Sequence, residues 1–195
     1  MFDLHHPIHS SIKRNVILLP AVALLVSSIY SPTAKAKIEA PKLRDMIASS
    51  DCIVLGKVIA ISKQDKAHIA EVEVERVLKG ERTIKRLYFW ATSTWACDIS
   101  HAEQNESGLY FLRRVTPTLE TDMQRRPLYC LTSSGYGHFI NKGQGRFEAP
   151  DLVRFPRNMS VTYVSKGKYI SAKLVTRDSI LRFISTGNKR TRPTH

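Results

Sequence analysis

The chain has 195 residues, of which 43% are hydrophobic and 24% are charged, and its 30 Lys and Arg against 17 Asp and Glu give a formal net charge of +13 at pH 7. Without the first 36 residues, which are considered next, 159 residues remain, and this length favours one domain with a substantial core over two. A basic surplus of this size attracts polyanions such as lipid head groups, acidic polysaccharide or nucleic acid, although it can also serve solubility alone.

Residues 1–36 have the pattern of a signal peptide. They contain a basic start, an apolar stretch and a small-x-small cleavage pattern, which are Lys13-Arg14, Val16–Val26 and Ala34-Lys35-Ala36. We therefore predict cleavage between Ala36 and Lys37, and export of the mature chain to the periplasm or beyond the cell. A membrane anchor is the alternative, but a spanning helix needs about 20 apolar residues, and Ser27-Ser28 interrupts this stretch.

A short helix is predicted over Pro41–Ser49, with Pro41 in its first turn and Leu43, Met46 and Ile47 on one face. That apolar face would cover one end of a sheet.

Two strands follow, Cys52–Ile61 and His68–Val77. In the second, apolar and acidic residues alternate, so one face should be buried and the other exposed to water; the alternating residues are Ala70, Glu71, Val72, Glu73, Val74 and Glu75. Gly56 predicts a bulge or bend that lets the first strand serve two parts of a curled sheet.

Runs of residues with high β-propensity between turn signals predict three more strands, at Thr83–Ala91, Gly108–Val115 and Leu128–Thr132. A hairpin that pairs Gly135–Ile140 with Gly145–Glu148 is predicted to follow them. Short antiparallel strands of this kind favour closure, because a closed barrel has no exposed edges. The predicted fold is mainly β: a five-stranded OB-like barrel with a short N-terminal helix and a C-terminal β-hairpin plus helix.

The barrel domain is assigned to residues 37–150, and residues 151–187 are predicted to form the hairpin and helix that pack on it. In this second region Thr176 should cap a helix over Arg177–Ser185, and Gly187 should end it. Residues 188–195 form a basic tail that we expect to be disordered. The stretch from residue 151 to the end holds 10 basic and 2 acidic residues, so the positive charge is concentrated there.

Three cysteines remain after cleavage, namely Cys52, Cys97 and Cys130. In an exported protein a pair of cysteines most often forms a disulfide. Cys97 and Cys130 lie in loop or strand-end contexts, whereas Cys52 opens an apolar strand. We therefore predict a Cys97–Cys130 bridge and a buried, free Cys52.

Five features carry a family resemblance. In chain order they are Ser50–Val58, Val72–Gly80, Cys97, Gly108–Leu112 and Cys130. This pattern resembles bacterial exported domains related to the tissue inhibitors of metalloproteinases (TIMP-like) and the netrin module, over about Pro41–Ser134. The resemblance implies an OB-like barrel with a Cys97–Cys130 bridge. The animal inhibitors, however, clasp the protease zinc with an N-terminal Cys-x-Cys, and this chain has Lys37-Ile38-Glu39 at that place.

The function that we expect from the sequence is non-catalytic binding of a protein or of an anionic envelope component, with no cofactor. Its candidate contacts are two basic pairs, Arg113-Arg114 and Arg125-Arg126. A first alternative is a peptidase inhibitor of the TIMP-like class that lacks the N-terminal clasp. Catalysis is not expected, because no phosphate-binding glycine loop, paired-histidine helix or serine elbow is present.

Two further alternatives stay open at this point. A metal-dependent hydrolase could use a zinc site drawn from Cys97, His101, Cys130 and His138, although their spacing is not that of a tight ligand pair. Nucleic acid could stack on Tyr88, Trp90 and Trp95. The predicted signal peptide argues against nucleic acid as a partner.

Overall fold

The computed structural model describes residues 39–64, 67–92, 99–115, 127–165 and 171–189. All of them belong to one compact unit, Glu39–His195. The predicted signal peptide, the predicted basic pair Arg125-Arg126 and the predicted disulfide partner Cys97 lie outside the described residues. The expectations stated for them therefore stay predictions.

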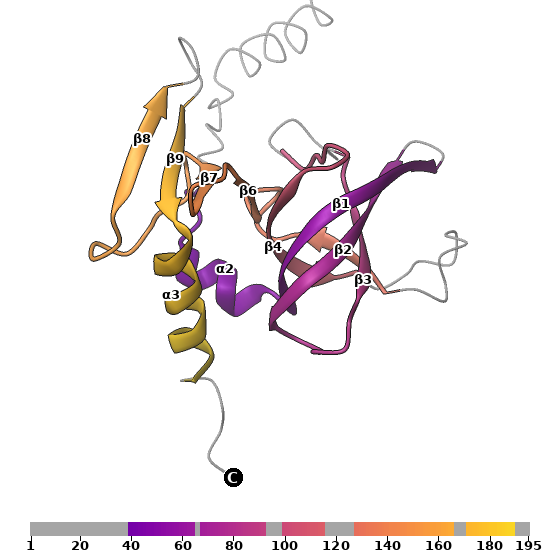
Figure 1. Cartoon of the computed structure of the whole chain (residues 1–195), viewed down its shortest axis with the longest axis horizontal. Helices are drawn as coiled ribbons and strands as arrows, with labels where there is room; N and C mark the ends of the chain where they lie inside the picture. The colour runs from indigo at the N-terminus through magenta and orange to yellow at the C-terminus, as the bar shows by residue number, and fades with distance from the viewer. Residues whose placement is uncertain (1–38, 65–66, 93–98, 116–126, 166–170, 190–195) are drawn as a thin grey trace, which may run out of the picture. The chain divides into compact units, whose positions relative to one another are not determined.

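The fold is built on a closed barrel of five strands (Figure 1). They are β1 (Cys52–Gln64), β2 (Ala67–Lys79), β3 (Arg86–Trp90), β4 (Ser107–Arg114) and β5 (Leu128–Leu131). The order β1-β2-β3-β5-β4 closes where β4 pairs with β1. Every neighbouring pair is antiparallel except β3 and β5, which run parallel. The predicted mainly β fold with an OB-like five-stranded barrel is confirmed.

Gly56 lies at one of the three register shifts between β1 and β2, where the sequence predicts a bulge or bend. The pairing register between β1 and β2 shifts between Leu55 and Gly56, and the same part of β1 pairs with β4 on its other edge. A Cβ atom on Gly56 would lie 2.6 Å from the carbonyl oxygen of Glu73 and 2.6 Å from a methyl group of Val72. Only glycine allows β2 to approach this closely.

Four more strands continue the sheet outward from β4, in the order β6 (His138–Asn141), β7 (Arg146–Pro150), β9 (Ser171–Thr176) and β8 (Val161–Ser165). They form the two predicted hairpins, β6 with β7 and β8 with β9. The turn between β6 and β7 contains Gly143 and Gly145 with φ of 73° and 66°, so glycine stands where the left-handed conformation is needed.

Two helices complete the described fold, α2 (Leu43–Ser49) and α3 (Arg177–Lys189). The predicted bounds need two corrections. Pro41 is not in the first turn of α2; it precedes the helix in extended chain, where its carbonyl oxygen accepts a hydrogen bond from the amide of Arg154 at 2.8 Å. Gly187 does not end α3, which continues to Lys189, because Gly187 lies where α3 packs on α2, with Ile47 as its nearest side chain.

The strands β1 and β4 bury both of their faces, because alternate residues enter two different cores. Tyr110 and Leu112 of β4 point into the barrel, together with Cys52, Val54, Val58, Val72, Leu87 and Phe89. Leu109 and Phe111 point outward into a second core that α2, α3, β7 and β9 cover, together with Leu43, Met46, Ile53, Phe139, Phe147, Ile180 and Ile184. The C-terminal elements are therefore packed on the barrel by a continuous hydrophobic layer.

Candidate functional site

A groove lies between α3 and the C-terminal end of β2. Its volume is about 610 Å³, and its lining combines three arginines with aliphatic side chains: Arg76, Val77, Leu78, Gly80, Arg82, Leu181, Arg182, Ile184 and Ser185. We call this set the basic groove. It draws on β2, on the turn after β2 and on α3, so it exists only when the helix is docked.

Local geometry explains how these three segments meet. Gly80 has φ of +100°, a conformation that favours glycine, and it turns the chain after β2 so that Arg82 lines the same groove as Arg76. Lys79 helps to hold this end of β2 in place, since its Nζ donates hydrogen bonds to the carbonyl oxygens of Ile47 at 2.7 Å and Ala48 at 3.2 Å, at the end of α2.

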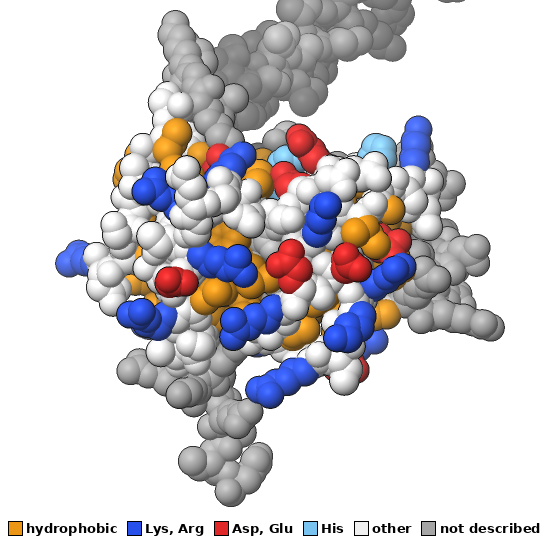
Figure 2. Space-filling model, in the orientation of Figure 1, with side chains coloured by type: hydrophobic (Ala, Val, Ile, Leu, Met, Phe, Trp, Pro, Cys, Tyr) orange, Lys and Arg blue, Asp and Glu red, His pale blue; other side chains and the backbone are white. Residues whose placement is uncertain are grey.

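The three arginines of the basic groove have no carboxylate within ion-pair distance in the described chain. No described Asp or Glu lines it, and Arg76, Arg82 and Arg182 form no ion pair among the residues that the structure describes. Figure 2 shows Lys and Arg side chains around hydrophobic surface on this face, with several Asp and Glu side chains among them. Three guanidinium groups without carboxylate partners favour the binding of an anion.

The basic pair Arg113-Arg114 lies elsewhere. Both side chains are exposed at the end of β4, opposite Cys130 and Tyr129 of β5, and neither lines the groove. The backbone amide of Arg114 donates a hydrogen bond to a carboxylate oxygen of Asp51 at 2.8 Å, so an acidic group stands beside this pair. Sequence reasoning chose the adjacent basic residues and missed the groove arginines. The positive charge concentrated in the C-terminal region pointed toward Arg182 alone, and no sequence signal marked Arg76 or Arg82.

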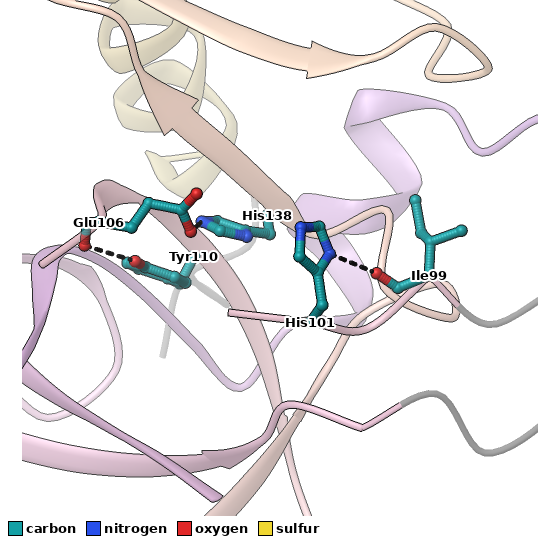
Figure 3. Close-up of polar contacts among 5 residues, drawn as sticks. All are labelled: Ile99, His101, Glu106, Tyr110 and His138. Atoms are coloured by element: carbon teal, nitrogen blue, oxygen red, sulfur yellow. Dashed lines mark hydrogen bonds and ion pairs between the residues drawn. The ribbon is translucent and has the colours of Figure 1, made fainter. Parts of the chain in front are cut away.

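A second cluster of polar residues lies where β4 and β6 pair, and it is shielded from solvent except for the exposed His101 (Figure 3). The rings of Tyr110 and His138 stack, with centroids 4.7 Å apart and planes at 14°. Glu106 Oε1 lies 3.1 Å from His138 Nε2, and the Tyr110 hydroxyl donates to the backbone carbonyl of Glu106 at 3.4 Å. His101 meets His138 edge-on with centroids 6.3 Å apart, and its Nδ1 lies 3.1 Å from the Ile99 carbonyl oxygen.

Gly108 leaves the space that His138 occupies. A Cβ atom on Gly108 would lie 3.0 Å from His138 Nε2 and 2.8 Å from the carbonyl oxygen of Phe139. The glycine that opens the predicted fourth strand is therefore required by the close approach of β6.

Burial controls the protonation of this cluster. It lowers the pKa of His138 to about 3, with His101 acting in the same direction. It raises the pKa of Glu106, and it raises the pKa of Tyr110. An ionised Glu106 so close to His138 would instead favour the imidazolium form. Burial dominates here, because Glu106 Oε1 and His138 Nε2 are shielded from solvent and do not form a hydrogen bond with each other.

The zinc alternative finds only part of its predicted ligand set assembled. His101 and His138 are neighbours, whereas Cys130 is on β5 and Cys97 lies outside the described residues. In the part of the chain that the structure describes, no three His, Cys, Asp or Glu side chains form a group that could hold a metal ion.

The two described cysteines differ in their surroundings. Cys52 is a free thiol and is buried in the barrel core, as predicted, and burial together with Asp51 raises its pKa to about 11. Cys130 is half-buried and is also a free thiol in the structure. Because its predicted partner Cys97 is outside the described residues, the Cys97–Cys130 bridge stays a prediction.

Comparison with known proteins gives no family assignment, since no family model matches the chain and no curated protein is significantly similar to it. Within the described ranges, no helix is long and apolar enough to cross a membrane.

Proposed function

We propose that this protein is an exported, non-catalytic binding module for an anionic envelope component or an acidic protein, and that the basic groove is its binding site. The observation that carries the proposal is the set of three guanidinium groups, Arg76, Arg82 and Arg182, which share one concave surface without a carboxylate partner in the described chain. The basic surplus of the C-terminal region adds a field that attracts the same class of ligand.

The chemistry of arginine supports an anion in this groove. A guanidinium group is permanently charged and presents a planar fork of donors that matches carboxylate or phosphate oxygens. Three such groups line the same groove. Their positions on a strand, a turn and a helix also limit how far each must reorganise on binding.

Export and family are parts of the same proposal, and they rest on the sequence. The pattern at residues 1–36 supports a signal peptide cleaved after Ala36. The motifs from Ser50 to Cys130, combined with an OB-like barrel, support a relationship to the netrin and TIMP-like domains. Because the N-terminal Cys-x-Cys is missing, binding in this chain would not use the zinc clasp of those inhibitors.

The test compares two variants of equal charge. In the first, Arg76, Arg82 and Arg182 are changed to Gln; in the second, Arg113, Arg114 and Arg157 are changed to Gln, all three of which are exposed outside the groove. Binding of dextran sulfate to the exported protein is measured by fluorescence anisotropy at several salt concentrations. We expect the groove variant to lose about tenfold or more in affinity, because hydrogen bonds to charged groups contribute about 1.5–3 kcal/mol each.

We expect the control variant to change affinity by about threefold or less, because exposed charges outside the site act mainly through the screened long-range field. Equal losses in the two variants would show that net charge alone attracts the polyanion and would overturn the assignment of the groove.

A further inference from the structure

The floor of the basic groove is hydrophobic, while its charge lies at the rim. Ile184 is only 1% exposed and belongs to the second core, and Leu78 and Leu181 are partly buried against the same core. Arg76, Arg82 and Arg182 are exposed. A ligand that fills this groove therefore meets aliphatic side chains below and guanidinium groups above.

We propose that the basic groove binds a phosphate-bearing amphiphile, that is, a phosphate monoester carried on acylated glycerol, as in phosphatidic acid. This inference rests on the proposed function and specifies its ligand class. The phosphate is held by the arginine rim, and the first part of the hydrocarbon chain covers Leu181 and Leu78.

Phosphate suits the rim because its oxygens accept paired hydrogen bonds from several guanidinium groups at once. Three guanidinium groups without an ion pair in the described chain also match a phosphate monoester, which carries more than one negative charge at neutral pH, better than a single carboxylate. The groove volume of about 610 Å³ lies within the range of small-molecule sites.

Hydrocarbon suits the floor better than a peptide does. Apart from the arginines, the side chains that line the groove are Val77, Leu78, Leu181, Ile184 and the single hydroxyl of Ser185. A peptide would bring backbone amide groups that need hydrogen-bond partners when they are covered. A hydrocarbon chain needs none and gains free energy from leaving water.

The experiment uses dihexanoyl phosphatidic acid below its micelle concentration as the probe, with titration calorimetry of the exported protein. Inorganic phosphate, dihexanoyl phosphatidylcholine and an acidic amphipathic peptide are titrated in parallel. We expect phosphatidic acid to bind about tenfold or more tightly than inorganic phosphate, because burying two methylene groups is enough for that factor. We expect it also to exceed phosphatidylcholine, whose positive headgroup opposes the arginine rim.

A floor variant separates this inference from simple anion binding. Leu181→Gln should weaken phosphatidic acid by about fivefold or more, since it removes apolar contact from the ligand, and should leave inorganic phosphate unchanged. Leu152→Gln, at an exposed leucine outside the groove, is the matched control and should change neither.

Three results would overturn the inference. Equal affinity for phosphate and phosphatidic acid would show that the floor contributes nothing, while leaving anion binding at the groove intact. Tighter binding of the peptide would favour a protein partner. If none of these probes binds and dextran sulfate binds both arginine variants equally, the proposed function fails as well.

Discussion

Glu106 Oε1 and His138 Nε2 lie 3.1 Å apart in the interior, and neither atom has a hydrogen-bond partner in the described part of the chain. Buried polar groups usually have partners, and an unsatisfied one lowers stability. The two side chains come from the end of the loop before β4 and from β6, and the Tyr110 ring stacks against the imidazole. The pair therefore makes the stability of the fold depend on pH in two opposing ways.

The histidine contribution is isolated by Glu106→Gln. The folded pKa of His138 is about 3 against an ordinary 6.5, so between these values the unfolded chain binds a proton that the folded chain does not. The free energy of unfolding of Glu106→Gln is compared with that of the double variant Glu106→Gln/His138→Phe. The difference between them should rise with pH up to 6.5, by up to about 1.4 kcal/mol per pH unit. Urea unfolding from pH 4.5 to 7.5 measures this slope, and a flat difference would contradict it.

The carboxyl contribution is isolated by His138→Phe, which keeps an aromatic ring against Tyr110. The folded pKa of Glu106 is raised above its ordinary 4.5 by burial, so the folded chain retains a proton that the unfolded chain has lost. Relative to the same double variant, the stability of His138→Phe should fall as pH rises from 4.5 through the folded pKa. A difference that increases with pH over this range would refute the assignment.

Gly56→Ala should destabilise the barrel by about 1–3 kcal/mol, the usual cost of overpacking, because its Cβ would collide with the backbone of β2 at 2.6 Å. Gly187→Ala is the control at a helical glycine. Its Cβ would have Ile47 as nearest neighbour at 3.8 Å, so it should raise stability by about 0.5–1 kcal/mol. Thermal unfolding of both variants tests the contrast, and wild-type stability of Gly56→Ala would disprove it.

Thiol accessibility tests the predicted cleavage and disulfide together. Intact mass of the exported protein should start at Lys37. Cys52 should resist alkylation in the native state, because its pKa of about 11 leaves little thiolate and the thiol is buried. After unfolding, one of the three cysteines should react before reduction and all three after it. Three reactive thiols before reduction would exclude the bridge, and retention of residues 1–36 would exclude cleavage.

The local pattern of the sequence determined much of the barrel. Alternation from Ala70 to Glu75 predicted which face of β2 is buried, because side chains on a strand change sides at every residue. Gly56 marked a register shift between β1 and β2, and Gly143 and Gly145 marked the turn between β6 and β7. These features depend on neighbours along the chain, so periodicity and backbone preference were enough to find them.

Only the tertiary structure decided which distant residues meet. Docking of α3 brings Arg182 to the groove that Arg76 lines, and the pairing of β4 with β6 sets His138 against Tyr110 and beside Glu106. The helix bounds also differ from those predicted from Pro41 and Gly187: α2 begins at Leu43, and α3 continues to Lys189. Strand register and helix docking are long-range relationships that leave no periodic signal in the chain, which is why the basic groove and the buried Glu106–His138 pair were not visible in the sequence.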